Sequence, residues 1–231
     1  MSAARAAPGG RLAHAVGSSA CFSGIVAALV YSGRGNWVDV AVLLLVGLGQ
    51  VLAFLAFRTW PARLEASAIL LLAGVSSAEQ LYDAVPWWDL AVHLLATYAL
   101  VWIPWNLRLR AGARRATSAS LPSYPPSRAP HPPSGPSEEG GSPSRSPLAG
   151  ASSPPEEPGP PPEEPAAPPF PARLRWCLGV GLALAVAWEL MELLGFLLVT
   201  PEIHIPPLDT ATDVLAGLLG AALCALRTRP A

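Results

Sequence analysis

Three pairs of ionisable residues are spaced so that each pair shares one helix face, and all three lie in segments that are otherwise apolar. The pairs are Asp89 and His93, Glu189 and Glu192, and Asp209 and Asp213. Residues three or four apart along a helix lie side by side. Ionisable groups at membrane depth are costly, and they commonly face the protein interior to serve a substrate, an ion or protons. These six residues are therefore the candidate catalytic residues.

The chemistry open to this set is either proton sharing or cation binding. Closely spaced carboxylates in a low-dielectric environment either hold protons or bind a positive ion. Oxygen ligands with one imidazole suit divalent ions such as Mg²⁺, Mn²⁺ or Zn²⁺. The sequence indicates one candidate set of ligands for such a metal ion, formed by His93, Glu189, Glu192 and Asp213.

Two of the pairs also have a plain structural interpretation. Asp209 could cap the last helix, with Asp213 in its first turn, where the helix dipole favours a negative charge. Asp89 could likewise be an N-terminal carboxylate, with His93 hydrogen-bonded to a neighbouring helix. Glu189 lies well inside an apolar helix, where a structural role requires a protonated partner. It is therefore the strongest single candidate.

The segments that must position these residues are long and apolar. The 231-residue chain is 52% hydrophobic and 13% charged, with positive mean hydropathy. Crossing about 30 Å of hydrocarbon takes roughly 20 apolar residues in a helix. The sequence therefore predicts an all-α polytopic membrane protein with about six transmembrane helices, the last four forming a core bundle. The predicted spans are 14–32, 37–57, 64–84, 87–106, 174–199 and 208–226.

Composition divides the chain into three parts. Residues 1–106 contain the first four predicted spans, and residues 173–231 contain the last two. Between them, residues 107–172 are dominated by Pro, Ser, Gly, Ala and Glu, most strongly from 116 to 171. Such a composition cannot bury a core. We expect this part to be a disordered cytoplasmic linker, acting either as a passive tether or as a ligand for a partner.

Arginine positions orient the predicted spans. Arg5, Arg11, Arg58, Arg63, Arg173, Arg175, Arg227 and Arg229 all flank the spans on one side. The short connections on the other side contain Arg34 alone. Basic residues collect on the cytoplasmic side of a membrane. We therefore expect a multi-pass protein of the plasma (inner) membrane with cytoplasmic N- and C-termini, and a polar site open to the extracytoplasmic side.

Acidic residues in the predicted spans are far from any arginine in the sequence. The chain has no Lys, and no Arg occurs from 64 to 107 or from 176 to 226, although Glu65, Glu79, Asp89 and Glu189 do. The sequence thus predicts that no protein cation neutralises the acidic cluster. The formal charge of −1 gives no argument for nucleic acid. The expected partner is the lipid bilayer.

Three motifs carry a resemblance to a known family. They are Trp87-Trp88-Asp89-x-x-x-His93, Trp188-Glu189-x-x-Glu192 and Asp209-Thr210-x-x-Asp213-x-x-x-Gly217-x-x-Gly220, where the glycines permit close helix approach. In order and spacing they resemble the YjdF-like family of bacterial integral membrane proteins, itself distantly similar to VanZ-like proteins. VanZ-like proteins commonly have Lys where this chain has Leu90, and Gln near Met191-Glu192. The resemblance implies a fold and a site, but no reaction.

Three functions fit these observations. The first is an envelope enzyme whose site uses a metal ion or shared protons in acid-base chemistry on a lipid or its headgroup. The second is a proton- or cation-coupled transporter, which predicts polar residues continuing inward. Residues 179–187, inward of Glu189, are apolar, so a one-sided site favours an enzyme or sensor. The third is a non-catalytic scaffold whose polar network fixes helix packing.

Overall fold

A computed structural model of the chain describes residues 8–85, 87–119, 168–198 and 207–228. These ranges are helical and contain no strand, so the all-α prediction is confirmed. The elements are α1 (Pro8–Ser19), η1 (Ala20–Phe22), α2 (Ser23–Ser32), α3 (Trp37–Ala56), α4 (Trp60–Ala78), α5 (Leu81–Ala84), α6 (Trp88–Ala119), α7 (Phe170–Leu198) and α8 (Pro207–Arg227).

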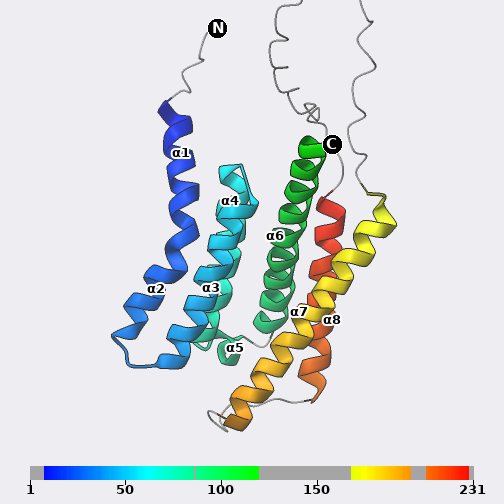
Figure 1. The fold of residues 1–231 in the computed structure, drawn as a ribbon. Helices are drawn as coiled ribbons and strands as arrows, with labels where there is room; N and C mark the ends of the chain where they lie inside the picture. Colours follow the sequence, from blue (N-terminus) through cyan, green and yellow to red (C-terminus); the bar gives the residue numbers. More distant parts are fainter. Residues whose placement is uncertain (1–7, 86, 120–167, 199–206, 229–231) are drawn as a thin grey trace, which may run out of the picture.

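Five segments of the described chain are long and apolar enough to cross a membrane. They are Leu12–Ser32, Trp37–Ala56, Trp88–Arg115, Phe170–Leu198 and Thr210–Arg227. Helix α4 is not among them, because Arg63 and Glu65 in its first turns lower its hydropathy. It nevertheless packs alongside α3 (Figure 1). Many large apolar side chains are exposed on the helices, as a lipid-facing surface requires.

Three predicted boundaries are wrong. Helix α6 does not end at 106 but continues to Ala119, because Ala and Arg in this stretch are good helix formers. The predicted span 64–84 ends at Ala78, and Gln80, with a left-handed φ of 52°, starts the separate short helix α5. The first helix begins earlier than predicted, at Pro8, and the first span, Leu12–Ser32, is interrupted by the 3₁₀ turn η1. The expected disordered linker falls mainly on residues 120–167, which lie outside the described residues.

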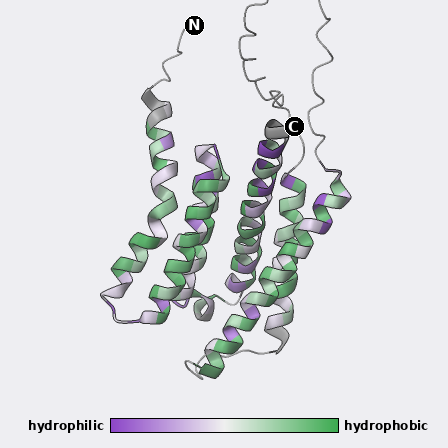
Figure 2. Ribbon diagram, in the orientation of Figure 1, coloured by the Kyte–Doolittle hydropathy of each residue, from purple (hydrophilic) through white to green (hydrophobic). Residues whose placement is uncertain are grey.

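The helices form two packed groups joined through α6. Helices α1 to α5 form the N-terminal group and α6 to α8 the C-terminal group, and α6 also packs against α3 and α4 (Figure 1). The long helices alternate in direction, so the start of α1 and the end of α8 lie at the same end of the bundle (Figure 1). We call this the arginine-rich end, because Arg58, Arg63, Arg108, Arg173 and Arg227 lie there. Figure 2 shows hydrophilic residues on α6 and α7 at this end.

An ion pair links two segments of the chain at each end of the bundle. At the arginine-rich end, Arg227 Nη2 donates to Glu65 Oε2 at 2.7 Å. At the other end, Arg34 Nη1 donates to Glu79 Oε1 at 2.7 Å. The hydroxyl of Tyr31 and this guanidinium hold the pKa of Glu79 below its usual range. The prediction that no cation neutralises the acidic residues is therefore wrong for Glu65 and Glu79, because folding brings distant arginines to them.

A buried amide compensates for the break in the first span. Gln50 of α3 is fully buried; its Oε1 accepts from Gly24 N at 2.7 Å, just beyond the 3₁₀ turn. Its Nε2 donates to Ser23 Oγ at 2.9 Å and to Ser67 O at 3.0 Å. One side chain therefore joins α2, α3 and α4. Without water at this depth, the Gly24 N–H depends on this acceptor.

We expect Gln50→Leu to lower the free energy of unfolding by about 1–3 kcal/mol, because it leaves the buried Gly24 N–H without its acceptor. Titration of the detergent-solubilised protein with SDS, followed by circular dichroism, measures this. Leu48→Ala, at a lipid-facing position on the same helix, is the control. An equal loss in both variants would contradict the role of Gln50.

Small residues bring α8 against α6 and α7. A Cβ placed on Gly220 would lie 2.1 Å from Leu94 O, and one on Gly217 would lie 3.0 Å from Thr97 Oγ1. On α7, a Cβ on Gly181 would lie 2.5 Å from Ala221 Cβ. The expected role of Gly217 and Gly220 in close helix approach is thereby confirmed.

Gly220→Ala should lower the free energy of unfolding by about 1–3 kcal/mol, because the new methyl group forces the α6 backbone away. The same SDS titration measures the loss. Gly179→Ala on α7 is a matched control, since no heavy atom lies within 4 Å of its new Cβ. Equal stability of the two variants would show that the crossing is looser than the structure indicates.

Candidate functional site

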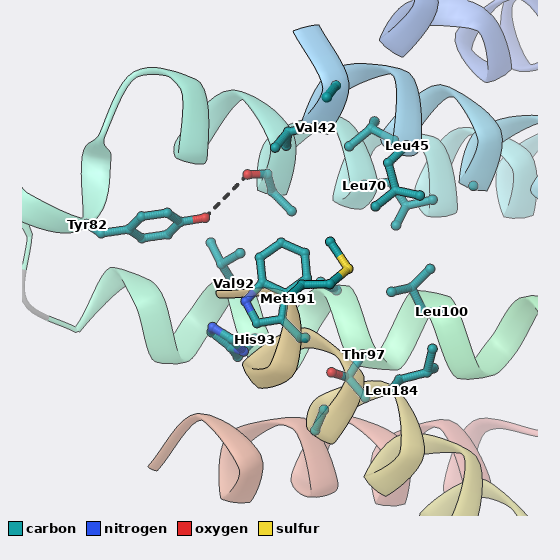
Figure 3. A pocket seen from close by; sticks show the side chains of 18 of the residues that line it. Val42, Leu45, Leu70, Tyr82, Val92, His93, Thr97, Leu100, Leu184 and Met191 are labelled. Carbon is teal, nitrogen blue, oxygen red and sulfur yellow. Dashed lines mark hydrogen bonds between the residues drawn. The ribbon is translucent and has the colours of Figure 1, made fainter. Parts of the chain in front are cut away.

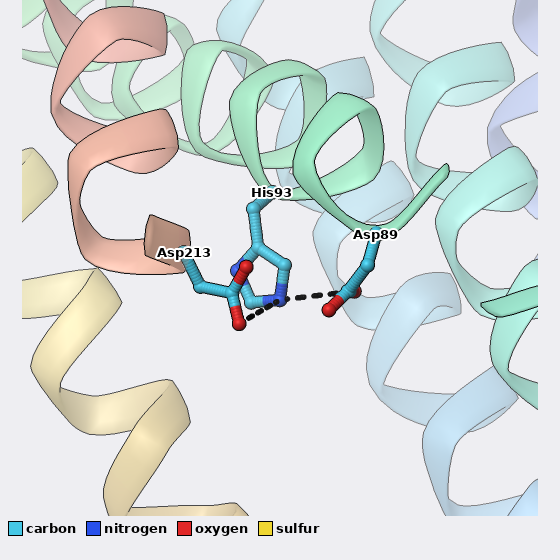
Figure 4. A group of neighbouring side chains, drawn as sticks. All are labelled: Asp89, His93 and Asp213. Atoms are coloured by element: carbon cyan, nitrogen blue, oxygen red, sulfur yellow. Dashed lines mark ion pairs between the residues drawn. The ribbon is translucent and has the colours of Figure 1, made fainter. Parts of the chain in front are cut away.

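Three ionisable side chains converge at the end of the bundle opposite the arginine-rich end. Asp89, His93 and Asp213 offer ligand atoms that all lie within 4.8 Å of one another (Figure 4). His93 Nε2 is 3.3 Å from Asp89 Oδ1 and 3.8 Å from Asp213 Oδ2. The side chain of Asp213 is only 4% exposed, whereas that of Asp89 is 26% exposed. We call these residues the Asp-His-Asp group.

Local sequence and helix packing each position part of the group. Asp89 lies in the first turn of α6, where the helix dipole favours a carboxylate, and His93 follows one turn later on the same face. Asp213 lies in the second turn of α8, one turn beyond the position that the capping interpretation assigns to it. Gly217, one turn further along α8, lets that helix approach Thr97, one turn below His93. The close crossing therefore places Asp213 beside the imidazole.

Helix α7 contributes through an aromatic residue. The ring of Trp188 meets His93 edge-on, with centroids 6.0 Å apart and planes at 87°. Trp188 Nε1 donates to Glu192 Oε1 at 2.7 Å. Glu192 is therefore linked to His93 through Trp188 and supports the group from one step away. The sequence signal for Trp188 was its place inside an apolar span, away from the membrane interfaces that Trp usually occupies.

The structure changes the candidate ligand set. It keeps His93 and Asp213 and adds Asp89, whereas Glu189 and Glu192 are outside the converging group found among the described residues. Glu189, half-buried on α7, had been the strongest candidate. Its neighbour Trp188 occupies the position that faces His93. Asp209 lies in the first turn of α8, and its side chain is outside the described part of the chain, so its predicted role stays a prediction.

The Asp-His-Asp group borders an apolar cavity of about 270 Å³ between α3, α4, α6 and α7. His93 lines it at the polar end, and Thr97 lies deeper (Figure 3). Trp188, in ring contact with His93, is also a lining residue. Tyr82 of α5 also lines it, donating its hydroxyl to Ala73 O at 3.4 Å. Burial raises the pKa of Tyr82, and nearby carboxylates add to the effect, so its hydroxyl stays protonated. No sequence pattern indicated Tyr82.

The geometry of the Asp-His-Asp group allows two kinds of chemistry. A protonated imidazole can donate from Nε2 to Asp89, as in an ion pair. A neutral imidazole with two carboxylates instead offers three ligands to a metal ion. Ligands about 2.1 Å from a tetrahedral ion are about 3.4 Å apart, close to the observed separations from Nε2.

Comparisons of the chain with protein-family models, with curated proteins and with solved structures found no match. The chain is a polytopic helical membrane protein with a polar Asp-His-Asp group next to an apolar cavity.

Proposed function

We propose that this protein binds a divalent metal ion through Asp89, His93 and Asp213 and uses it in chemistry on the headgroup of an envelope lipid. The observation that carries this proposal is the convergence of three ligand atoms from two helices. One imidazole and two carboxylates suit Zn²⁺ or Mn²⁺ and leave coordination positions for water or substrate. Such an ion would supply Lewis acidity and an activated water.

The position of the group supports a substrate taken from the outer leaflet. Arginines gather at the opposite end of the bundle, while the end that holds the group has Arg34. By the positive-inside rule, the arginine-rich end faces the cytoplasm of a plasma (inner) membrane. In this orientation the start of α1 and the end of α8 both lie on the cytoplasmic side. The Asp-His-Asp group then faces the extracytoplasmic side.

The cavity supports an enzyme more than a transporter. Beyond Thr97 its lining is aliphatic within the described chain, with Leu45, Leu70 and Leu100 around it (Figure 3). A proton or cation moving inward needs polar groups along its path. The two alternatives to the proposed enzyme, a coupled transporter and a packing scaffold, make different predictions about bound metal.

We also propose membership of the YjdF-like family. The motif residues behind that resemblance include Asp89, His93, Asp213, Gly217 and Gly220. They lie together at the crossing of α6 and α8, around one polar group. The order of the three motifs along the chain is the support for this assignment.

Protein purified in detergent and loaded with Zn²⁺ or Mn²⁺ should hold about one ion per chain by elemental analysis. Asp213→Asn and His93→Gln should lower this to below about a tenth, because a three-ligand site does not survive the loss of one ligand. Glu189→Gln should keep the metal. This variant matches Asp213→Asn in chemistry but lies outside the group.

Circular dichroism of each variant shows whether its helices persist. A folded native protein that takes up neither ion would overturn the metal proposal and leave an ion-paired scaffold. Metal lost in Glu189→Gln as well as in Asp213→Asn would restore the ligand set predicted from the sequence.

A membrane-impermeant maleimide tests the orientation in intact cells. The three buried native cysteines, Cys21, Cys177 and Cys224, are first replaced by alanine. Trp87→Cys, at an exposed position beside the Asp-His-Asp group, should be labelled from outside. Arg115→Cys, near the end of α6, should be labelled only after lysis. The opposite pattern would place the group in the cytoplasmic half of the membrane.

A further inference from the structure

The cavity between the two helix groups has the polarity of a lipid binding site. Its polar lining residues Tyr82 and His93 lie at the end that holds the Asp-His-Asp group, and Thr97 lies deeper (Figure 3). Trp188, which also lines the cavity, contacts the His93 ring edge-on. From there it extends toward the middle of the bundle between aliphatic side chains such as Leu70 and Leu100. A lipid of the leaflet on the side of the Asp-His-Asp group has this orientation. Its headgroup lies at the membrane surface, and its chains point to the bilayer centre.

We propose that this cavity holds one acyl chain of a bilayer phospholipid, with the phosphate headgroup at the Asp-His-Asp group. The inference rests on the proposed function for the headgroup, since a phosphate beside two carboxylates needs a bridging metal ion. The chain site rests on the cavity itself. His93 is the residue that joins the two parts, because it belongs to the polar group and also lines the cavity.

Two lining residues of the cavity are also exposed on the outside of the bundle, as entry from the bilayer requires. They are Leu45 of α3 and Met191 of α7, which are about half exposed, at 47% and 51%. Helix α3 packs on α2, α4 and α6, whereas α7 packs on α8 and α6. The facing edges of α3 and α7 therefore border the cavity on the lipid side. A chain can enter there without crossing a polar surface.

The size of the cavity and its surroundings favour hydrocarbon over water. A volume of about 270 Å³ is room for about nine groups the size of a water molecule or a methylene. Buried water needs two to four polar partners, and the aliphatic walls beyond Thr97 offer none. A void at this depth would forfeit dispersion contacts along its lining. An acyl chain from the surrounding bilayer restores those contacts.

A photoactivatable lipid tests the chain site directly. The full chain is reconstituted into vesicles of phosphatidylethanolamine and phosphatidylglycerol that contain phosphatidic acid with a diazirine at mid-chain. After illumination, mass spectrometry locates the adducts. We expect them to concentrate on peptides that contain the cavity residues Leu70, Ala73, Thr97 and Leu100, above the level on other lipid-exposed helix faces.

Two variants fill the cavity and one serves as a matched control. Ala96→Leu on α6 and Ala73→Leu on α4 add the same side-chain volume to opposite walls. Ala183→Leu adds that volume to the exposed surface of α7, outside the lining. Filling the cavity should lower its labelling by about fivefold to tenfold, because a side chain and an acyl chain cannot share the space. Ala183→Leu should leave the labelling unchanged.

The outcomes separate this inference from the proposed metal function. Cavity labelling that equals the labelling of the bilayer-facing surface, or that persists in both folded filling variants, overturns the chain site whatever the metal content. Cavity labelling in a protein that binds no metal supports the chain site and counts against the metal function alone. Metal retained in Ala96→Leu while the labelling falls supports both, because it shows that the chain site and the metal ligands are separate parts of one site.

Discussion

The close crossing of α6 and α8 sets the arrangement of the C-terminal helices and of the polar group between them. Gly220 lies so close to Leu94 O that the space for a side chain does not exist there, and Gly217 lies against Thr97. This approach sets Asp213 of α8 beside His93 of α6. It also fixes α8 as the support on which α7 packs, with Gly181 against Ala221. Small residues thus give the polar group its geometry.

Polar groups inside the described bundle are combined into a few local clusters. Gln50 closes the break in the first span, and Glu65 is held by Arg227, whose guanidinium lies 4.1 Å from the ring centre of Trp102. These clusters use neutral amides or pair opposite charges, as a hydrocarbon environment demands. The Asp-His-Asp group differs, because it places two carboxylates on one imidazole. This combination of two carboxylates and one imidazole is the observation behind the proposed metal site.

The apolar cavity beside the Asp-His-Asp group lies between the two helix groups. Helix α6 belongs to the C-terminal group and also packs on α3 and α4, so it forms one wall of the cavity and holds His93 at its mouth. Trp188 connects the cavity to Glu192 on α7. The cavity therefore combines an apolar lining with a polar group at one end. A lipid has the same two parts, an apolar chain and a polar headgroup.

The long apolar helices and their order follow from the sequence alone, since hydropathy over roughly 20 residues decides membrane insertion. The Asp89 and His93 pair and the glycine face of α8 follow from it too, because residues one turn apart are neighbours in any helix. Which of the predicted pairs come into contact depends on the tertiary structure. The orientation of α7 about its own axis turns Trp188 toward His93 and leaves Glu189 outside the group. Glu65 contacts Arg227, which is 162 residues away in the sequence. These contacts depend on how each helix is oriented about its axis and on how the helices cross. The spacing of residues within one helical segment carries no information on either.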